Sequence, residues 1–318
     1  MSPASSPSSR LDWLVFIALG GMWGSSYLFI KFGVEEGLTP FTLVALRLGI
    51  GLALLAIVVA VAREPLPRNP RIYGHLVVMS VINIVLPFFL ITSAERTVDS
   101  ALASILNGTV PLFAIVIAAF VLQDEPITLN RLAGLAIGFA GIVVLTGGSL
   151  GSGGDLIGQL ALVGAAVSYG AGAVYARRNI RGLRPMIPSL FQVGFAFVIS
   201  ATLALALEHP WTEPLTGKAL FSVAWLGIFG SGLAYLGMFR LIGRWGATRA
   251  SMVAYLLPVF GIALGVLVAH ETIGLPVLIG TLLIVAGVAL ASSSRGARRI
   301  FGRTPTAPVE LRESHPGG

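Results

Sequence analysis

Polar side chains recur at helical spacing inside the apolar stretches of this chain, and these are the groups that could do chemistry. Ser104 and Asn107 are followed by Pro111, at intervals of three and four residues. This spacing places all three on one face of a helix. A proline inside a helix leaves the carbonyl four residues earlier, here that of Asn107, without its hydrogen bond. Together these groups can bind a polar solute, or they can bridge neighbouring helices.

Aromatic side chains with polar tips share this distribution, and such rings can stack on a solute and also donate hydrogen bonds to it. The further candidate ligands are Trp23, Tyr27, Asn83, Tyr169, Tyr235 and Tyr255. Two further prolines, Pro87 and Pro258, lie inside apolar stretches and are expected to bend their helices. We predict that these residues line a substrate site. The alternative interpretation is that the aromatic residues only pack helices together.

Arg47 is the only ionisable residue expected well inside an apolar stretch, seven positions after Pro40. At 1.5 Å per residue it lies about 10 Å deep. It can attract a substrate carboxylate, but the favoured interpretation is that it extends to the interface or ties loops together. The carboxylates all lie at stretch edges, Glu95 and Asp99 at one edge and Glu125 at the other. This pattern favours a facilitator, or weak proton coupling through an edge group.

The sequence lacks the residue patterns that enzymatic, metal-binding and nucleotide-binding sites need. It has no cysteine, and its four histidines are scattered at stretch edges and in the tail. No nucleophile–base pair or carboxylate pair falls within the apolar stretches, and no phosphate-binding GxxxxGK[ST] motif occurs. We therefore expect no enzyme activity, no cofactor and no metal. A membrane-embedded enzyme or a non-transporting scaffold remains the alternative to a carrier.

The composition requires a membrane environment. The chain is 55% hydrophobic and 11% charged, whereas soluble proteins carry about 25% charged residues. Its apolar residues come in blocks of about twenty, the length that crosses a bilayer as a helix. The net charge of +7 lies in short loops and a tail, so it does not indicate a nucleic-acid partner. We predict an all-α polytopic membrane protein.

Ten helical spans are expected where clusters of Gly, Pro and charged residues divide the chain. They are 13–33, 41–62, 72–93, 100–121, 130–147, 156–176, 187–207, 219–239, 249–269 and 273–293. Residues 1–10 and 294–318 are expected to be cytoplasmic tails, the first disordered and the second basic, with 148–155 as a linker. Most Lys and Arg residues fall on one side of this topology, which places both termini in the cytoplasm.

The two halves, 11–147 and 156–293, repeat each other. Glu125 and Glu271 are separated by 146 positions, and Trp23 is separated from Tyr169 by the same interval. Each half has five expected spans, so the second must enter the membrane from the opposite side, an arrangement typical of alternating access. Glu125 and Glu271 precede the fifth and tenth spans, where the helix dipole favours a carboxylate. We interpret them mainly as helix-start groups, with a gating or proton role as the alternative.

The motifs GGMWGSSYLFIK, SALASILNGTVPLF and QDEPITLNRLAGLAIGFAGIVVL, with the Pro–Arg spacing ending at Arg47, carry a family resemblance. Residues 12–293 resemble the EamA-type branch of the drug/metabolite transporter superfamily. The resemblance implies an inner-membrane carrier that exports small metabolites, often amino acids, with helices 1, 3, 4, 6, 8 and 9 around its cavity. Its implied partners are a small-molecule substrate and the lipid bilayer, while the oligomeric state stays open. The second half departs from the pattern at Gln192, where the equivalent of Arg47 would lie, and at Thr272 in place of Pro126.

Overall fold

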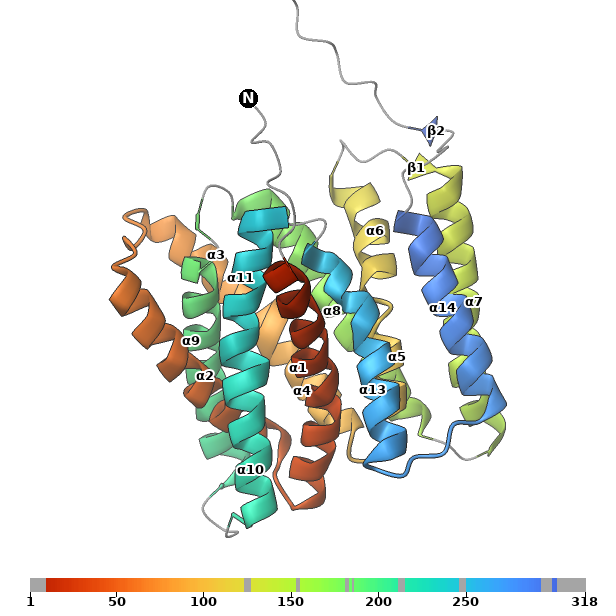
Figure 1. Ribbon diagram of the computed structural model, residues 1–318, viewed down its shortest axis with the longest axis horizontal. Coiled ribbons are helices and arrows are strands. Elements are labelled where there is room, and N and C mark those ends of the chain that lie inside the picture. Colours follow the sequence, from red (N-terminus) through yellow and green to blue (C-terminus); the bar gives the residue numbers. More distant parts are fainter. Residues whose placement is uncertain are drawn as a thin grey trace, which may run out of the picture.

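The computed structural model describes residues 10–122, 127–152, 155–180, 183–184, 186–210, 215–245, 250–292 and 299–301. These residues form a bundle of helices that run up and down between two ends (Figure 1). Eight helices are long and apolar enough to cross a membrane, and two shorter apolar helices, Met252–Leu267 and Leu275–Ala291, accompany them. The protein is therefore a nearly all-helical membrane protein, as predicted.

In the first half, α1 (Arg10–Glu35) and α2 (Pro40–Ala62) are followed by two divided spans and one continuous helix. The divided spans are α3 (Pro70–Ser80), η1 (Val81–Val85) and α4 (Leu86–Ala94), then α5 (Ser100–Asn107) and α6 (Val110–Val121). The continuous helix is α7 (Leu129–Ser152), which extends into the linker expected from the sequence. Its apolar pattern ends earlier, so the sequence shows where the membrane segment stops but not where the helix stops.

The second half begins with α8 (Leu156–Asn179). The elements that follow are α9 (Met186–Leu203), η2 (Ala204–Glu208), α10 (Gly217–Trp225), η3 (Leu226–Leu233), α11 (Ala234–Trp245), η4 (Ser251–Tyr255), α13 (Leu256–Leu267) and α14 (Leu275–Ser292). We call the end of the bundle where α1 begins the Asp12 end, and the opposite end, where α4 stops, the Glu95 end.

A short antiparallel pair of strands departs from the all-α expectation. Strand β1 (Ile127–Thr128) precedes α7, and β2 (Arg299–Phe301) pairs with it from the C-terminal tail. Both lie at the same end of the bundle as the start of α1 (Figure 1). The expected tails are otherwise largely outside the described residues.

Each of the three mid-span prolines follows an irregular stretch of helix. Pro87 is the second residue of α4, directly after the π-helical segment η1. Pro111 is the second residue of α6, after a break at Gly108 and Thr109, and Pro258 is the third residue of α13, after a 3-10 turn. Proline suits the first turn of a helix, because its missing N–H has no partner there. These prolines therefore begin new helical segments.

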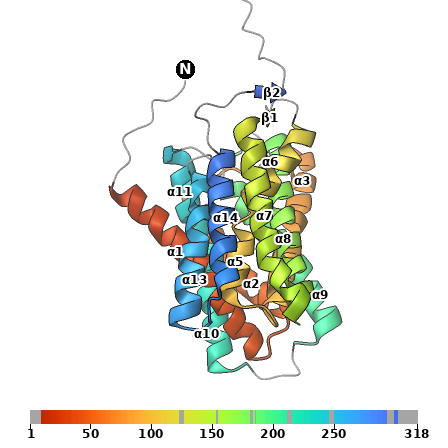
Figure 2. The same cartoon turned by 90° about the vertical axis from the view of Figure 1, so that its right-hand side faces the viewer.

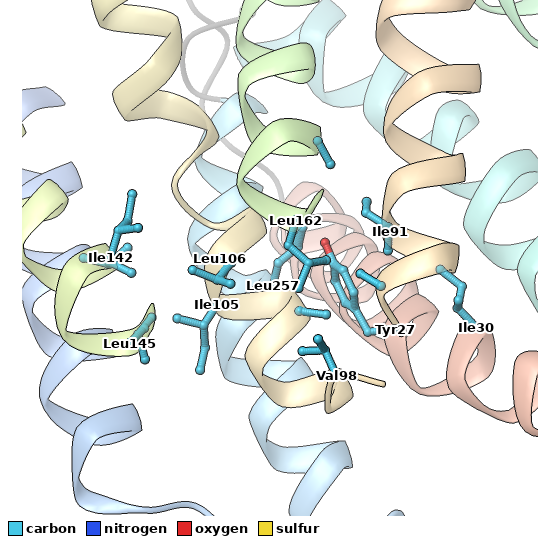
Figure 3. Packing of buried hydrophobic residues seen from close by; sticks show 14 of the residues in the cluster. Tyr27, Ile30, Ile91, Val98, Ile105, Leu106, Ile142, Leu145, Leu162 and Leu257 are labelled. Atoms are coloured by element: carbon cyan, nitrogen blue, oxygen red, sulfur yellow. The ribbon is translucent and has the colours of Figure 1, made fainter. Parts of the chain in front are cut away.

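Helices of the two halves intermix in the bundle, with α1 against α13, α2 against α9, and α4 against α8. Their shared core includes Tyr27, Leu106, Leu162 and Leu257, which come from four different helices (Figure 3). The pair α7 and α14 packs most closely and lies along one edge of the bundle (Figures 1 and 2). A Cβ atom on Gly287 of α14 would collide with the α7 backbone at Gly134 and Gly138, so these two backbones touch.

Candidate functional site

A hydrogen bond between α5 and α1 forms the centre of the candidate site. The Nδ2 group of Asn107 donates to the hydroxyl oxygen of Tyr27 over 2.6 Å, and both side chains are buried. Asn107 is the last residue of α5, immediately before the break that Pro111 follows. Its other amide atom, Oδ1, is buried and has no hydrogen-bond partner among the residues that the structure describes. The pair therefore offers one unused acceptor in the interior.

Arg47 of α2 lies in the interior, within electrostatic range of Tyr27. Its side chain is only 3% exposed, its Nε donates to the Ser231 hydroxyl over 3.3 Å, and its guanidinium lies 4.3 Å from the centre of the Phe88 ring. Tyr27, Tyr169 and Tyr235 lie within range of its charge. The interpretation favoured from the sequence, extension to the interface, is wrong, because the side chain is enclosed by neighbouring spans.

No carboxylate that the structure describes forms an ion pair with Arg47. The ion pairs within the described part of the chain join Arg184 to Glu64, Lys218 to Glu35 and Glu36, and Arg240 and Arg244 to Asp12. A buried charge is costly unless it is paired with an opposite charge. The Arg47 position is therefore suited to an anionic group brought by a ligand.

Two π-helical segments, η1 and η3, are held by the first helices of the two halves in related ways. The Trp23 Nε1 of α1 donates to the carbonyl of Gly230 in η3 over 3.1 Å. The Ser168 hydroxyl of α8 donates to the carbonyl of Ile82 in η1 over 2.5 Å. A π segment changes the local backbone hydrogen bonding and often marks a functional region. The first helix of each half thus holds the π segment of one neighbouring span.

The second helix of each half contacts a π segment as well. Arg47 of α2 binds Ser231 in η3, while Gln192 of α9 accepts a hydrogen bond from Asn83 in η1 over 3.3 Å. Gln192 is the residue that the repeat aligns with Arg47. The two halves therefore make the same kind of contact, charged in one and neutral in the other. Asn83, which the sequence predicts to bind substrate, is thus also joined to α9.

The remaining predicted ligands separate into two groups. Tyr235 forms an edge contact with Trp23 at 6.4 Å between ring centres, and Tyr169 packs against the core that contains Tyr27. By contrast, the Ser104 hydroxyl donates to the carbonyl of Ala101 within its own helix, and the side chain packs beneath Gly261 of α13. The Tyr255 hydroxyl lies 3.5 Å from the carbonyl oxygen of Val288 in α14. The first group contains Tyr169 and Tyr235, which lie within electrostatic range of Arg47.

Glu95 lies directly after α4 and is completely buried, not at an exposed edge. In the part of the chain that the structure describes, neither of its carboxylate oxygens has a hydrogen-bond partner. Burial raises the pKa of this carboxyl well above its usual range, and Glu271 adds to the effect, whereas Lys31 and Arg47 oppose it. Glu125, the other predicted edge carboxylate, lies outside the described residues.

Glu271 caps a helix start, but not the one that the sequence indicated. Its Oε1 accepts hydrogen bonds from the backbone N–H and hydroxyl of Ser100, at 2.8 and 2.6 Å, and its Oε2 accepts one from the Ala101 N–H at 2.9 Å. These are the first residues of α5, whereas α14 begins only at Leu275. The correction has a simple cause, since a loop carboxylate can reach any helix N-terminus packed beside it.

Sequence reasoning missed two carboxylates that join the halves. Asp12 of α1 is completely buried between two α11 residues, 3.0 Å from Arg240 and 3.4 Å from Arg244. Glu208 of η2 accepts hydrogen bonds from the backbone N–H groups of Phe41 and Thr42 at the start of α2, at 2.9 and 2.8 Å. In the sequence, each of the two is only an acidic residue at the boundary of an apolar stretch. That position does not indicate which residues it contacts.

A pocket of about 220 Å³ lies away from these residues. It is lined by side chains of α6 and α8 with Leu122 and Arg131, and it includes none of the predicted ligands. Within the described part of the chain, no group of three His, Asp or Glu residues could hold a metal ion. The geometry therefore supports a binding site of tyrosine, amide and guanidinium groups.

The chain is similar in sequence to several proteins that are named as transporters or as an efflux pump. The chain is 24% identical to the uncharacterized transporter YoaV of Bacillus subtilis, over 90% of this chain and 98% of that protein. It is 29% identical to the uncharacterized inner membrane transporter YedA of Escherichia coli, over 80% and 82%. It is 26% identical to a probable amino-acid metabolite efflux pump of Salmonella typhimurium, over 88% and 94%.

A solved crystal structure, 25% identical in sequence, superimposes with a TM-score of 0.61, over 89% of this chain and 97% of that one. The EamA-like transporter family model matches residues 11–147 and again residues 156–293. Since these two matches cover most of the chain, it belongs to the EamA-like transporter family.

Proposed function

We propose that the protein is a secondary carrier that exports amino acids or related small metabolites across the inner membrane by alternating access. Its substrate site is formed by Tyr27, Asn107, Arg47, Tyr169 and Tyr235. The two shorter apolar helices complete ten crossings. The Lys and Arg distribution places the Asp12 end in the cytoplasm.

The substrate class rests on one observation, that two groups around Tyr27 lack partners among the described residues. The Arg47 guanidinium forms no ion pair with a described carboxylate, and the Asn107 Oδ1 has no described hydrogen-bond donor. A carboxylate would supply the missing counter-charge of Arg47. An ammonium group would supply hydrogen-bond donors for the free Oδ1 of Asn107. An amino acid carries both groups on one carbon atom, and the surrounding tyrosine rings suit an apolar side chain. The Salmonella relative named as a probable amino-acid metabolite efflux pump supports this class, and YedA supports the location.

Alternating access requires two arrangements of the same helices, and two features support it. The π segments η1 and η3 occupy related spans and are held through related contacts, so either half can open in a similar way. The buried Asp12 joins α1 to α11 at one end of the bundle, where it can close access to the site.

The test is counterflow in liposomes that contain the purified protein. Liposomes loaded with one unlabelled amino acid at a time should accumulate the labelled form for at least one of them. The variant Arg47→Gln, which installs the residue found at the aligned position 192, should reduce this uptake at least tenfold. Uptake of the corresponding amino-acid amide, which lacks the carboxylate, should change much less. Asn107→Ala and Tyr235→Ala should also reduce uptake without reducing membrane expression.

The control is Arg184→Gln, because Arg184 is exposed and pairs with Glu64 outside the spans. It should transport as the unaltered protein does. Absence of counterflow for every solute in folded protein would contradict the carrier and favour a scaffold. Unaltered uptake in all three site variants would contradict the site as described here.

A further inference from the structure

Glu95 is a buried acid that the proposed substrate contacts do not use. It follows the last residue of α4 at the Glu95 end, is fully enclosed, and has no hydrogen-bond donor for either carboxylate oxygen among the described residues. An ionised carboxylate in this buried position has lost its hydration without gaining hydrogen bonds, and this raises its free energy. The neutral, protonated form is therefore favoured until a positive charge arrives beside it.

Charged and titratable groups on three other segments lie within electrostatic range of Glu95. Lys31 and Tyr27 lie on α1, Arg47 lies on α2, and Glu271 precedes α14. Lys31 donates from Nζ to the carbonyl of Val98 over 3.2 Å, so its ammonium group is held by the loop that follows Glu95. Tyr27 is one helical turn from Lys31, roughly 6 Å along α1. Glu95 thus lies close to the candidate site, on its Glu95-end side.

We infer that Glu95 binds a proton in the empty carrier and releases it when the ammonium group of a substrate enters, so that substrate is exchanged for a proton. This inference rests on the proposed function, since it takes a zwitterionic substrate bound at Arg47 and Tyr27. The arriving ammonium supplies both the positive charge and the donors that the carboxylate lacks. One O–H bond of Glu95 is broken, and its proton passes to water for each substrate bound.

The return step follows because the proton and the substrate ammonium group compete for the Glu95 carboxylate. When the site opens toward the Glu95 end, a proton from that side neutralises the carboxylate and removes the attraction for the ammonium group. Substrate then leaves, and the protonated carrier turns back. This exchange drives export whenever the proton gradient points into the cell. The sequence favoured a facilitator, or weak proton coupling through an edge group such as Glu95, and the enclosure of Glu95 favours the second of these.

The direct test is proton release on binding. Purified protein in weakly buffered detergent solution at pH 7 is mixed with an amino acid that passes the counterflow assay, and a pH indicator records the change. We expect close to one proton released per site. The des-amino analogue, a carboxylic acid without the ammonium group, should release none. Binding without proton release, or equal release by the des-amino analogue, would overturn the inference while leaving the carrier itself intact.

Variants assign the proton to Glu95. Glu95→Gln should abolish proton release and also abolish amino-acid uptake driven by a pH gradient across liposomes. Glu95→Asp keeps an ionisable group, so it should retain release with a shifted pH dependence. Asp99→Asn is the matched control, since Asp99 is an exposed carboxylate in the same loop, and it should behave as the unaltered protein. Proton release that persists in Glu95→Gln, or that is lost in Asp99→Asn, would overturn the assignment.

Discussion

Asn107 donates a hydrogen bond to the Tyr27 hydroxyl over 2.6 Å, which joins the broken end of α5 to the middle of α1. The two residues are far apart in sequence, and both belong to the first half. Tyr27 is also within range of the charges of Arg47 and Glu95. This bond therefore fixes the amide group of Asn107, whose oxygen we assign to the substrate, to a tyrosine that lies within range of both charged groups of the site.

Tyr27→Phe should lower both stability and transport. It removes the hydroxyl and leaves the Asn107 amide group buried without an acceptor, which costs about 1–3 kcal/mol. Thermal unfolding in detergent measures the first effect and counterflow measures the second. Tyr73→Phe is the control, because the Tyr73 hydroxyl donates to the Pro67 carbonyl near the Asp12 end, away from the site. If Tyr27→Phe left the melting temperature and uptake unchanged, the bond would have no role in the site.

Asp12→Asn should open the Asp12 end. Asp12 is buried, and neutralising it weakens its attachment to Arg240 and Arg244, so the conformation closed at this end loses an ion pair that joins α1 to α11. Because the chain has no cysteine, a single reporter, Met22→Cys on α1, can be labelled alone. A membrane-impermeant maleimide should label it several-fold faster in the Asp12→Asn background.

Glu64→Gln provides the comparison for that experiment. Glu64 pairs with the exposed Arg184 at 2.8 Å, and exposed pairs contribute little. Its labelling rate should match that of the reporter alone. Equal rates with and without Asp12→Asn would show that this ion pair does not hold the end closed.

The membrane character, the repeat and the residues around Arg47 could be predicted because they follow from hydropathy and helical periodicity. Trp23, Tyr27, Asn107, Tyr169 and Tyr235 were all candidates on type and position. The partners of the charged residues could not be predicted. Whether Arg47 faces an interface or the interior depends on which helix packs against it. Helical periodicity does not indicate which helix that is.

The surroundings of the carboxylates could not be predicted for the same reason, because they depend on which segments pack together. Glu271 lies four residues before α14 in the sequence, yet it caps α5, because the loop after α13 folds back beside that helix start. Glu95 was placed at an edge because it follows a span, but neighbouring segments enclose it. The π segments could not be predicted from the sequence either, since residues such as Asn83 and Ser231 fit a regular α-helix equally well.

Glu271→Ala should destabilise the fold by about 1–3 kcal/mol, because the Ser100 and Ala101 N–H groups lose their acceptors at the start of α5. Gly265→Ala should destabilise it too, since a Cβ at that position would collide with the Glu271 carboxylate. Thermal unfolding of both single variants and the double variant forms a cycle. We expect the glycine substitution to cost much less once the carboxylate is gone. Strictly additive effects would contradict the proposed conflict.

Gly287→Ala tests the close pairing of α14 with α7. Its methyl group would meet the backbone of Gly134 and Gly138, which cannot move aside as a side chain can, so the helices must separate. Overpacking of this kind costs about 1–3 kcal/mol, and it should exceed the gain of up to about 1 kcal/mol that alanine brings to a helix. Gly74→Ala in α3 isolates that gain, because a Cβ there meets no atom within 4 Å. Thermal unfolding should therefore show the two alanine substitutions moving the melting temperature in opposite directions, and a shift of the same sign in both would mean that helix propensity, not backbone contact, governs this pair.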